Sequence, residues 1–324
     1  MNTPLVSIVV PCYNMENNVD RFVDSIMIQD YPNIELIMVD DGSVDNTYSS
    51  IELKRSLIES KEIRLILIRK RNEGAAAAIN TGLKFVTGEF LIWPDSDDFL
   101  LPNSIKNRVD YMLHHESCAL LRTNAYIYNE ANLNRKVGSL VSTNRTYSVE
   151  DFARFKIVWC PGCYMIRMKY FDSINPHREI YVSRAGQNIQ MLLPMVYYFG
   201  CDSMEDSLYG YVIYNKSHSH SIKTYEQHMK HIRDLEICVK ETLKNIQGDT
   251  RWLFKLTRIE LLKISCNKAW EFQKKSDFEK YINELSSLSE LTIQLKLMKH
   301  LSYNKWSELL IRSINYFQRR IRND

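Results

Sequence analysis

Three carboxylates follow a short apolar run in the sequence Phe90-Leu-Ile-Trp-Pro-Asp-Ser-Asp-Asp-Phe99. The apolar run predicts a buried central strand, so Asp95, Asp97 and Asp98 would lie at the C-terminal end of that strand. Three anions within four residues repel one another and are costly to bury unless a cation neutralises them. Oxygen ligands of this kind suit Mg²⁺ or Mn²⁺, which proteins usually bind together with the phosphates of a substrate. The alternative is an acidic turn in which Asp98 caps the next helix.

Polar residues also follow three earlier apolar segments, and helical patterns separate these segments from one another. Strands are expected at 5–11, 34–39 and 63–68, and helices at 19–30, 45–60 and 75–86. This alternation predicts an α/β fold with a parallel, doubly wound sheet and helices on both faces. The strands are followed by Tyr13 and Asn14, by Asp40 and Asp41, and by Asn72. The strand ends would meet at one edge of the sheet, where open α/β sheets bind ligands; a plain turn at each end is the alternative.

The rest of the chain divides into an irregular part and a helical part. Residues 101–221 mix short helices and strands with polar loops, whereas apolar residues repeat at helical spacing from residue 222 onward. We therefore expect one domain at 1–221, with halves at 1–100 and 101–221, and a C-terminal all-helical extension at 222–324. The extension holds 20 Lys and Arg against 13 Asp and Glu, while residues 1–221 hold 22 against 26. Such a basic region suits an anionic membrane surface; because no nucleic-acid-binding motif accompanies it, we expect no nucleic acid partner.

One segment of the extension, 306–322, can form an amphipathic helix. Its apolar stripe consists of Trp306, Leu309, Leu310, Ile314 and Phe317, and its charges are Arg312, Arg319, Arg320 and Arg322. A helix of this kind can lie in an anionic membrane interface. The alternative is a helix that packs on its own domain or on a second subunit, which would give a homodimer.

Composition and chain start exclude several other classes of protein. No run of 18 or more apolar residues is present, so we expect no membrane span, and the first residues lack the features of a secretory signal. Of the seven scattered cysteines, Cys160 and Cys163 are spaced like a metal or redox pair, but no second pair accompanies them. Buried reduced thiols in a reducing cytosol are therefore expected. We expect a cytoplasmic protein, either free or peripheral at the inner face of the cell membrane.

These residues together give the chain a resemblance to the family 2 glycosyltransferases of bacterial polysaccharide synthesis. The matching motifs are Val6-Ser-Ile-Val-Val-Pro-Cys-Tyr-Asn14, Val39-Asp-Asp-Gly-Ser-Val-Asp-Asn-Thr47, Asn72-Glu-Gly74 with Asn80-Thr-Gly82, Gly88-Glu-Phe-Leu-Ile92, and Asp95-Ser-Asp97. They cover about residues 4–100 in the family's order and spacing; each is weak alone, but the ordered set is specific. A weaker match continues through 159–170 and 208–219. The resemblance implies the GT-A fold, whose nucleotide-binding half would be 1–100 and whose acceptor-binding half would be 101–221.

The resemblance also implies roles for individual residues. The nucleotide would contact Pro11, Tyr13, Asn14, Asp41, Asn72, Asp95 and Ser96, and Mn²⁺ or Mg²⁺ would be held by Asp95, Asp97, Asp98 and His218. Asp41 would accept the imide N–H of the base, which favours uracil over cytosine because cytosine N3 carries no proton to donate. Asp97 would be the main metal ligand, and the ion would neutralise the leaving nucleoside diphosphate. For His218, a surface or nucleic-acid role within Ser217-His-Ser-His220 is the alternative.

The chain departs from the family pattern at two places. Many relatives carry an arginine where this chain has Ala78-Ile79-Asn80, and Arg69, Lys70 or Arg71 could substitute for it. The second departure concerns the general base, since an inverting transfer needs a carboxylate to take the proton of the acceptor hydroxyl. The family usually provides a Glu-Asp pair at the start of a helix, but here that place reads Gly186-Gln187-Asn188, and an amide cannot act as a base.

Three accounts of the missing pair stay open. Gln187 and Asn188 could bind the acceptor while Glu205 or Asp206 acts as the base; the alignment could be shifted locally; or the protein could be a poor catalyst. The resemblance implies a metal-dependent, inverting hexosyl- or N-acetylhexosaminyltransferase. It would move a sugar from a UDP-sugar to a hydroxyl of a glycan or lipid-linked acceptor in cell-surface polysaccharide synthesis. The alternative is a non-catalytic sugar-nucleotide-binding or scaffolding member of a glycan-assembly complex.

Overall fold

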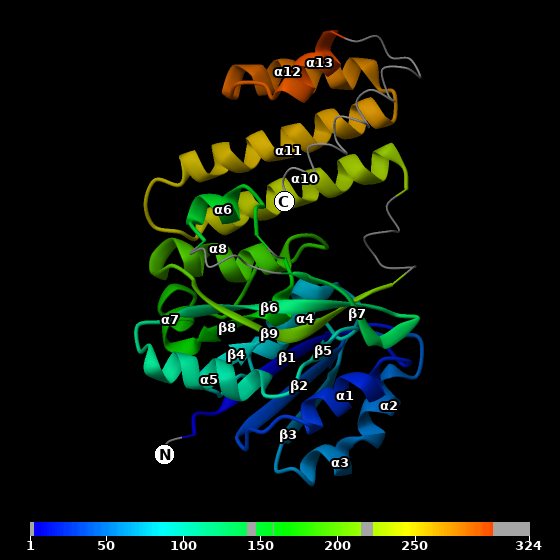
Figure 1. The fold of residues 1–324 in the computed structure, drawn as a ribbon, viewed down its shortest axis with the longest axis vertical. Helices are drawn as coiled ribbons and strands as arrows, with labels where there is room; N and C mark the ends of the chain where they lie inside the picture. Colours follow the sequence, from blue (N-terminus) through cyan, green and yellow to red (C-terminus); the bar gives the residue numbers. More distant parts are fainter. Residues whose placement is uncertain (1–2, 141–146, 158, 215–222, 301–324) are drawn as a thin grey trace.

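A nine-stranded mixed sheet forms the centre of the molecule (Figure 1). The computed structural model describes residues 3–140, 147–157, 159–214 and 223–300. The strands are β1 (Val6–Cys12), β2 (Ile34–Asp40), β3 (Arg64–Arg69), β4 (Phe90–Ile92), β5 (Phe99–Leu100), β6 (Leu120–Asn129), β7 (Asn132–Leu140), β8 (Tyr164–Arg167) and β9 (Asp202–Ile213). Their order in the sheet is β3-β2-β1-β4-β8-β6-β9-β5, and β7 pairs with β6.

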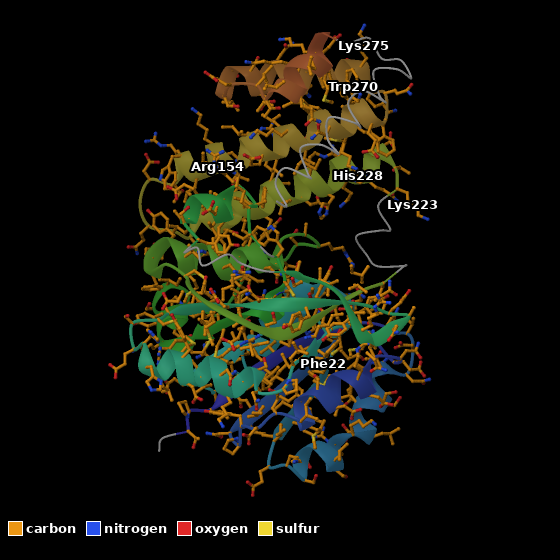
Figure 2. The ribbon with its side chains drawn as sticks, viewed as in Figure 1. Phe22, Arg154, Lys223, His228, Trp270 and Lys275 are labelled. Atoms are coloured by element: carbon orange, nitrogen blue, oxygen red, sulfur yellow. The ribbon has the colours of Figure 1, made fainter. Side chains whose placement is uncertain are left out.

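The first half of the sheet has the predicted parallel order. Strands β3, β2, β1 and β4 are parallel neighbours, and helices connect them: α1 (Val19–Met27), α2 (Thr47–Leu53), α3 (Arg55–Glu59) and α4 (Ala75–Leu83). Helix α1 forms because its apolar residues share one face, and Val19, Phe22, Val23 and Ile26 are buried. Figure 2 labels Phe22 in the lower half of the view, among the blue elements of the N-terminal half. The helix expected at 45–60 is interrupted at Lys54, so it forms two short helices.

One buried carboxylate, that of Glu35, links neighbouring segments at the edge of the sheet where the parallel strands begin. Glu35 at the start of β2 is 1% exposed. It accepts hydrogen bonds from the Ser7 hydroxyl (2.5 Å), from the Thr87 N–H (2.6 Å) and hydroxyl (2.8 Å), and from the Gly88 N–H (3.2 Å). Gly88 is required here because a Cβ at this residue would stand 2.6 Å from the Ser7 hydroxyl oxygen. This acid therefore joins β1, β2 and the segment that leads into β4.

The second half of the sheet contains the antiparallel strands. β8 is antiparallel to β4 and β6, β9 runs parallel to β6, and β5 is antiparallel to β9. The helices of this half are α5 (Ser104–His114), α6 (Val149–Ala153), α7 (Met168–Ile174) and α8 (Gln187–Phe199). Polar loops were expected within 101–221, and no strand was singled out at 132–140, which form β7. β7 was missed because most of its side chains are exposed and polar, so the apolar alternation of a half-buried strand is absent.

A stack of helices follows the sheet, as predicted for the C-terminal region. Helices α10 (Tyr225–Lys244), α11 (Arg251–Glu271), α12 (Lys275–Leu288) and α13 (Ile293–His300) lie in successive layers beyond α8 (Figure 1). They share a second apolar core, in which Trp270 lies edge-on to Phe278 with ring centroids 5.3 Å apart. Figure 2 shows Trp270 between α11 and α12. The predicted boundary at 221/222 and the amphipathic segment 306–322 lie outside the described residues.

Two further expectations concern cysteines and membrane spans. All seven cysteines are free and buried, which confirms the prediction of buried reduced thiols. Within the described ranges, every helix is too short or too polar to cross a bilayer.

Candidate active site

The loops that follow β1, β2, β3 and β4 meet at one edge of the sheet. The parallel register places Cys12 beside Asp40, Asp40 beside Arg69, and Ile8 beside Ile92. Because these strands end side by side, the residues after each strand share one crevice edge. The polar residues predicted to bind a nucleotide and a metal therefore come from neighbouring loops of one sheet.

The loops after β1 and β2 are tied together by Asn14. The Asn14 N–H donates to the Ser43 hydroxyl (3.0 Å), and the Val44 N–H donates to Asn14 Oδ1 (3.0 Å). Asn14 has a φ of 52°, a left-handed conformation that asparagine tolerates better than most residues. Its neighbour Tyr13 is 47% exposed, so the ring is free to stack on a planar ligand, and Pro11 is half-buried.

Asp41 at the end of β2 holds the loop that follows β3. Its carboxylate is 3% exposed and accepts hydrogen bonds from Lys70 Nζ (3.0 Å), from the Glu73 N–H (3.0 Å) and from the Gly74 N–H (2.7 Å). Three donors thus engage the two oxygens, and the imide of a base would share an oxygen with a backbone N–H. The role of Asp41 in base recognition stays a prediction. Asn72 lies in the same loop, and its side-chain oxygen accepts from the Arg184 guanidinium (3.0 Å).

The acidic loop after β4, residues 95–98, carries charges that the protein does not neutralise. Asp95 and Asp97 are half-buried, and Asp98 is buried. Burial and the neighbouring Asp97 charge raise the pKa of Asp95 to about 7. Burial also raises the pKa of Asp97, which the Arg21 charge offsets in part. Within the part of the chain that the structure describes, no ion pair reaches these three carboxylates.

Asp98 attaches the acidic loop to β9. The Val212 N–H donates to Asp98 Oδ1 (2.8 Å), while Oδ2 is buried without a hydrogen-bond donor among the described residues. Burial, followed by the charges of Asp97 and Asp95, raises the pKa of Asp98 well above its ordinary value, and the Tyr209 hydroxyl and the Val212 N–H lower it in part. Asp98 thus already serves a structural role, and its part in metal binding stays a prediction.

Arg21 and Tyr214 hold the same loop from two other elements, and the sequence analysis did not single them out. The Tyr214 hydroxyl donates to the Asp97 carbonyl oxygen (2.7 Å). The Arg21 guanidinium, which comes from α1, donates to that carbonyl and to the Tyr214 hydroxyl. Arg21 Nε is buried with no partner among the described residues. No local signal distinguishes Arg21 in the sequence, because it lies within an ordinary amphipathic helix and 76 residues from Asp97.

The acidic loop fits a divalent cation in part. Asp95 and Asp97 supply carboxylate oxygens of the kind that Mg²⁺ and Mn²⁺ prefer, and burial raises the pKa of both carboxyl groups. Among the described residues, no group of three or more acidic, histidine or cysteine side chains is arranged around one point. Two carboxylates with a bound diphosphate are a common way to hold Mg²⁺, so Asp95 and Asp97 suffice for such an ion. His218 lies outside the described residues.

The start of α8 lies close to the acidic loop. Its first residues, Gln187 and Asn188, are the ones predicted to bind the acceptor. Asn188 Oδ1 accepts from the Trp93 indole N–H (3.3 Å), and Asn188 Nδ2 donates to the Trp159 carbonyl oxygen (3.2 Å). Trp93 precedes Asp95 by two residues, so Asn188 links α8 to the strand that carries the carboxylates. Gln187 is half-buried beside it. Acceptor binding by Gln187 and Asn188 stays a prediction.

Glu205 and Asp206, the candidate bases, lie on β9. Both are exposed, and the Glu205 carbonyl oxygen accepts from Asn124 Nδ2 (2.7 Å). Glu205 and Asp206 precede Tyr209 by four and three residues, and the Tyr209 hydroxyl donates to the Asp95 carbonyl oxygen (3.4 Å). A strand rises about 3.3 Å per residue, so the two carboxylates are displaced roughly 10–13 Å along β9 from that contact. Their role as bases stays a prediction.

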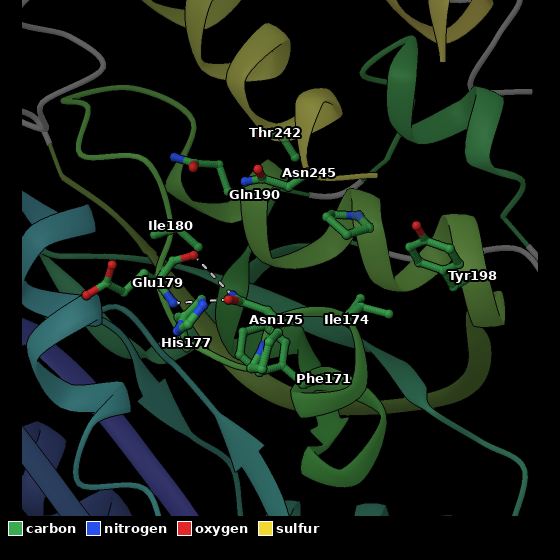
Figure 3. Close-up of a pocket in the computed structure, with 12 residues that line it drawn as sticks. Phe171, Ile174, Asn175, His177, Glu179, Ile180, Gln190, Tyr198, Thr242 and Asn245 are labelled. Carbon is green, nitrogen blue, oxygen red and sulfur yellow. Dashed lines mark hydrogen bonds between the residues drawn. The ribbon is translucent and has the colours of Figure 1, made fainter. Parts of the chain in front are cut away.

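A cavity of about 390 Å³ lies away from the acidic loop, between α7, α8 and the end of α10 (Figure 3). Its wall combines Phe171 and Tyr198 with the polar residues Asn175, His177 and Asn245. The close-up shows Asn175 bonded to the backbone of Glu179, so part of this polar wall is already engaged. None of the residues predicted for the active site lines the cavity.

Comparisons with known proteins agree with this arrangement. The chain is 37% identical over 115 residues to a Haemophilus influenzae protein named as a glycosyltransferase, which covers 36% of this chain and 45% of that protein. It is 34% identical over 150 residues to the Escherichia coli UDP-Glc:alpha-D-GlcNAc-diphosphoundecaprenol beta-1,3-glucosyltransferase WfgD. This match covers 46% of this chain and 55% of WfgD. The chain thus spans about half the length of these curated relatives.

Solved structures show the same fold at low sequence identity. Staphylococcus aureus TarS 1–349 in complex with UDP-GlcNAc matches with a TM-score of 0.61 and 17% identity, covering 88% of this chain and 82% of TarS. The Pyrobaculum calidifontis mannosyltransferase PcManGT, in complex with GDP-Man and Mn²⁺, matches with a TM-score of 0.58 and 14% identity, covering 96% and 84%. These matches confirm the predicted GT-A fold. The sequence model described as Glycosyl transferase family 2 matches residues 7–174, just over half of the chain, and the chain therefore belongs to this family.

Proposed function

We propose that the chain is a metal-dependent, inverting glycosyltransferase that moves a sugar from a UDP-sugar to a hydroxyl of a glycan or lipid-linked acceptor. The observation that carries this proposal is the acidic loop at the carboxyl edge of a GT-A sheet, in which Asp95 and Asp97 are half-buried and form no ion pair with any residue that the structure describes. A carboxylate with a purely structural role would accept hydrogen bonds from nearby donors. The oxygens of Asp95 and Asp97 are instead available to bind a cation that also binds a diphosphate. The UDP-sugar named for WfgD and the UDP-GlcNAc bound to TarS support the choice of donor.

The loops after β1, β2 and β3 would bind the nucleotide. The exposed ring of Tyr13 would stack on the base beside Pro11. The hydrogen bond from the Asn14 N–H to the Ser43 hydroxyl fixes the loop that carries Tyr13. Asp41 would face the base from the other side, Asp95 would face the ribose, and Asn72 and Ser96 would contact the nucleotide. Backbone hydrogen bonds fix the side chains of Asn14 and Asp41 before the donor arrives, which lowers the entropy cost of binding.

The acidic loop would hold Mn²⁺ or Mg²⁺ through Asp97 and Asp95, with Asp98 and His218 as further predicted ligands. A bound ion supplies positive charge to the leaving diphosphate. The contribution of the chain is to keep the Asp97 backbone in place, through the hydrogen bonds from Arg21 and Tyr214 to its carbonyl oxygen. The acceptor hydroxyl would approach from the side of Gln187 and Asn188, and a carboxylate, with Glu205 and Asp206 as candidates, would take its proton.

The test is release of UDP and formation of a glycosylated product. The protein is incubated with UDP-glucose or UDP-GlcNAc, Mn²⁺ and a polyprenyl-diphosphate-linked sugar acceptor, and compared with Asp97→Ala. We expect release that depends on Mn²⁺ and is lost in Asp97→Ala. Absence of turnover with every common donor, together with donor binding that needs no metal, would contradict the enzyme proposal. For the base, Glu205→Gln and Asp206→Asn are assayed separately, and a loss of roughly 100-fold or more in kcat identifies it.

A second candidate function is a sugar-nucleotide-binding or scaffolding member of a glycan-assembly complex. Asn188 favours this candidate, because it occupies the place of the usual carboxylate and is bonded to Trp93 and Trp159. Such a protein would bind UDP-sugars without releasing UDP. A cytoplasmic location and a peripheral membrane contact or a homodimer through 306–322 stay predictions, since that segment lies outside the described residues.

A further inference from the structure

The donor proposed above carries a diphosphate, and the chain lacks the family's usual arginine at Ala78-Ile79-Asn80. The contacts of the three candidate substitutes, Arg69, Lys70 and Arg71, show whether their charges are free to bind an anion. Arg69 is engaged with β2 and the loop after it, because its Nε lies 3.2 Å from Asp40 Oδ2 and its Nη2 donates to the Ser43 carbonyl oxygen (3.0 Å). Its charge is therefore already paired with a buried carboxylate.

Lys70 and Arg71 are no better placed. Lys70 Nζ lies 3.0 Å from Asp41 Oδ1 and 2.7 Å from Glu73 Oε2, so two carboxylates share its charge. The Arg71 side chain is 88% exposed, and its only ion pair among the described residues is with Glu73 at 3.5 Å. The one described partner of Arg71 is therefore a carboxylate, which competes with an anionic ligand for its charge.

Arg184 is a further cation at the same loop; its side chain is exposed, as that of Arg71 is, but its partner is different. It comes from the acceptor-binding half, and its Nη2 donates to Asn72 Oδ1 (3.0 Å), a neutral partner. Its aliphatic stem lies over Gly74, since a Cβ added there would stand 3.5 Å from Arg184 Cγ. Among the described residues, no carboxylate lies within 4.0 Å of its guanidinium. Arg184 therefore brings an unpaired positive charge to the loop that holds Asp41 and starts α4.

The segment that carries Arg184, residues 175–186, is held at several points and is called the strap here. Asn80 of α4 binds the backbone of Ile180 on both sides, with its Nδ2 donating to the carbonyl and its Oδ1 accepting from the N–H (2.8 Å each). Gln190 of α8 binds the backbone of Tyr181 in the same two-sided way (2.6 and 2.9 Å). A cation on a fixed segment loses less entropy when it binds an anion than a cation on a free surface side chain.

We propose that Arg184 binds the diphosphate of the donor and replaces the arginine that is missing from α4. This inference rests on the proposed function, because it assigns an anion-binding residue to the same donor. Among the described residues, the N-terminus of α4 beside it has neither a side-chain cap nor an acidic residue in its first turn, which favours the same anion. Arg184 differs from Arg69 and Lys70 in that no carboxylate of the described residues forms an ion pair with it.

The experiment compares binding of UDP, uridine and inorganic pyrophosphate to the full chain, by calorimetry with and without Mn²⁺. Arg184→Gln should weaken binding of UDP and pyrophosphate by roughly 10- to 100-fold, the effect of one charge-assisted hydrogen bond, and leave uridine within about 2-fold. Arg184→Lys should recover part of the loss. The matched control is Arg71→Gln, which removes the same charge from the neighbouring loop and should leave all three affinities and the melting temperature unchanged.

Each outcome has a distinct meaning. If the wild type binds UDP and Arg184→Gln binds it equally well, or if uridine binding falls as much as UDP binding, the Arg184 inference is overturned while the proposed function stands. If the wild type binds pyrophosphate through Arg184 but not UDP, the proposed donor is wrong and the anion site stands. If the wild type binds neither ligand, both proposals are overturned.

Discussion

Two sets of buried or half-buried carboxylates lie at opposite ends of the same parallel strands, and they differ in their hydrogen bonds and ion pairs. Glu35, where the strands begin, accepts hydrogen bonds from Ser7, Thr87 and Gly88 and has Arg64 at 3.6 Å. Asp95, Asp97 and Asp98 lie where the strands end; Asp98 accepts from the Val212 N–H and lies beside the Tyr209 hydroxyl, and no ion pair reaches the three carboxylates within the described residues. The described residues thus provide several hydrogen bonds to the Glu35 carboxylate and few to the three aspartates.

The difference separates an acid that stabilises the fold from acids that are predicted to bind a ligand. A buried carboxylate with several donors stabilises the folded state, because its desolvation is offset by charge-assisted hydrogen bonds. Buried carboxylates without donors destabilise the folded state, and proteins retain such groups mainly at functional sites. The comparison predicts that mutations at the two ends of the strands affect different properties, and four experiments test it.

The largest effect is expected for Asp97→Asn. The substitution removes a ligand charge and keeps the side-chain volume, so turnover of a UDP-sugar should fall by roughly 100- to 1,000-fold. Stability should stay the same or increase, since an unpaired buried charge is removed. UDP release and urea denaturation measure the two properties. Asp30→Asn, at an exposed aspartate paired with Lys106, is the control and should change neither. A variant that unfolds more easily and still turns over would contradict the comparison.

Glu35→Gln should show the reverse pattern. A glutamine amide cannot accept from all the donors around Glu35, and it places an N–H₂ group against the N–H groups of Thr87 and Gly88. We expect a loss of about 3 kcal/mol in the free energy of unfolding, measured in urea. The Michaelis constants of the folded variant should stay within about 2-fold of the wild type. A fully stable variant would show that the Glu35 network contributes little.

The third experiment measures the stability that the ligands add. Mn²⁺ and UDP together, each near 100 times its dissociation constant, should stabilise the wild type by about 2.7 kcal/mol or more, and EDTA should abolish the metal-dependent part. Glu35→Gln should gain the same increment from its lower baseline, and Asp97→Asn should gain little from Mn²⁺. Equal increments in all three proteins would place the metal elsewhere.

The smallest effect is expected at Arg21, which binds the acidic loop through its backbone. Arg21→Met removes the hydrogen bonds to the Asp97 carbonyl and to the Tyr214 hydroxyl, and the concentration of Mn²⁺ for half-maximal activity should rise about 10-fold. Saturating Mn²⁺ should restore most of kcat, which a direct catalytic role would not allow. Lys106→Met, an exposed cation of another helix, is the control. An unchanged Mn²⁺ dependence would show that Tyr214 alone holds the loop.

The sequence predicted the parallel half of the fold well, because each element there carries a complete local signal. The strand expected at 34–39 is β2 (Ile34–Asp40), and the helix expected from Val19 is α1 (Val19–Met27). Their apolar residues are spaced for one buried face or for full burial, and loop residues mark their ends. The meeting of polar loops at one edge follows from parallel order alone, so it was predictable too.

The contacts that support the candidate site were not predictable from local pattern. Arg21 and Tyr214 meet at Asp97 from positions 193 residues apart in the chain. Arg184 reaches Asn72 across 112 residues. Side chains that act at such separations have no periodicity of their own, and only the tertiary fold determines which cation lies beside which loop. The run of Arg69, Lys70 and Arg71 was the stronger signal in the sequence, but its charges are paired or solvated.

The glycine at the start of α8 connects the predicted acceptor-binding residues to the C-terminal helices. Gly186 has a φ of +74°, and a Cβ there would stand 2.7 Å from Cys238 Sγ and 3.0 Å from Leu235 of α10. α10 therefore presses directly on the turn between Arg184 and Asn188. A chain shortened before residue 222 would lose this backing, and the residues predicted to bind donor and acceptor would lose their alignment. A substitution in α10 that moves this turn can therefore alter the crevice without changing any residue predicted to line it.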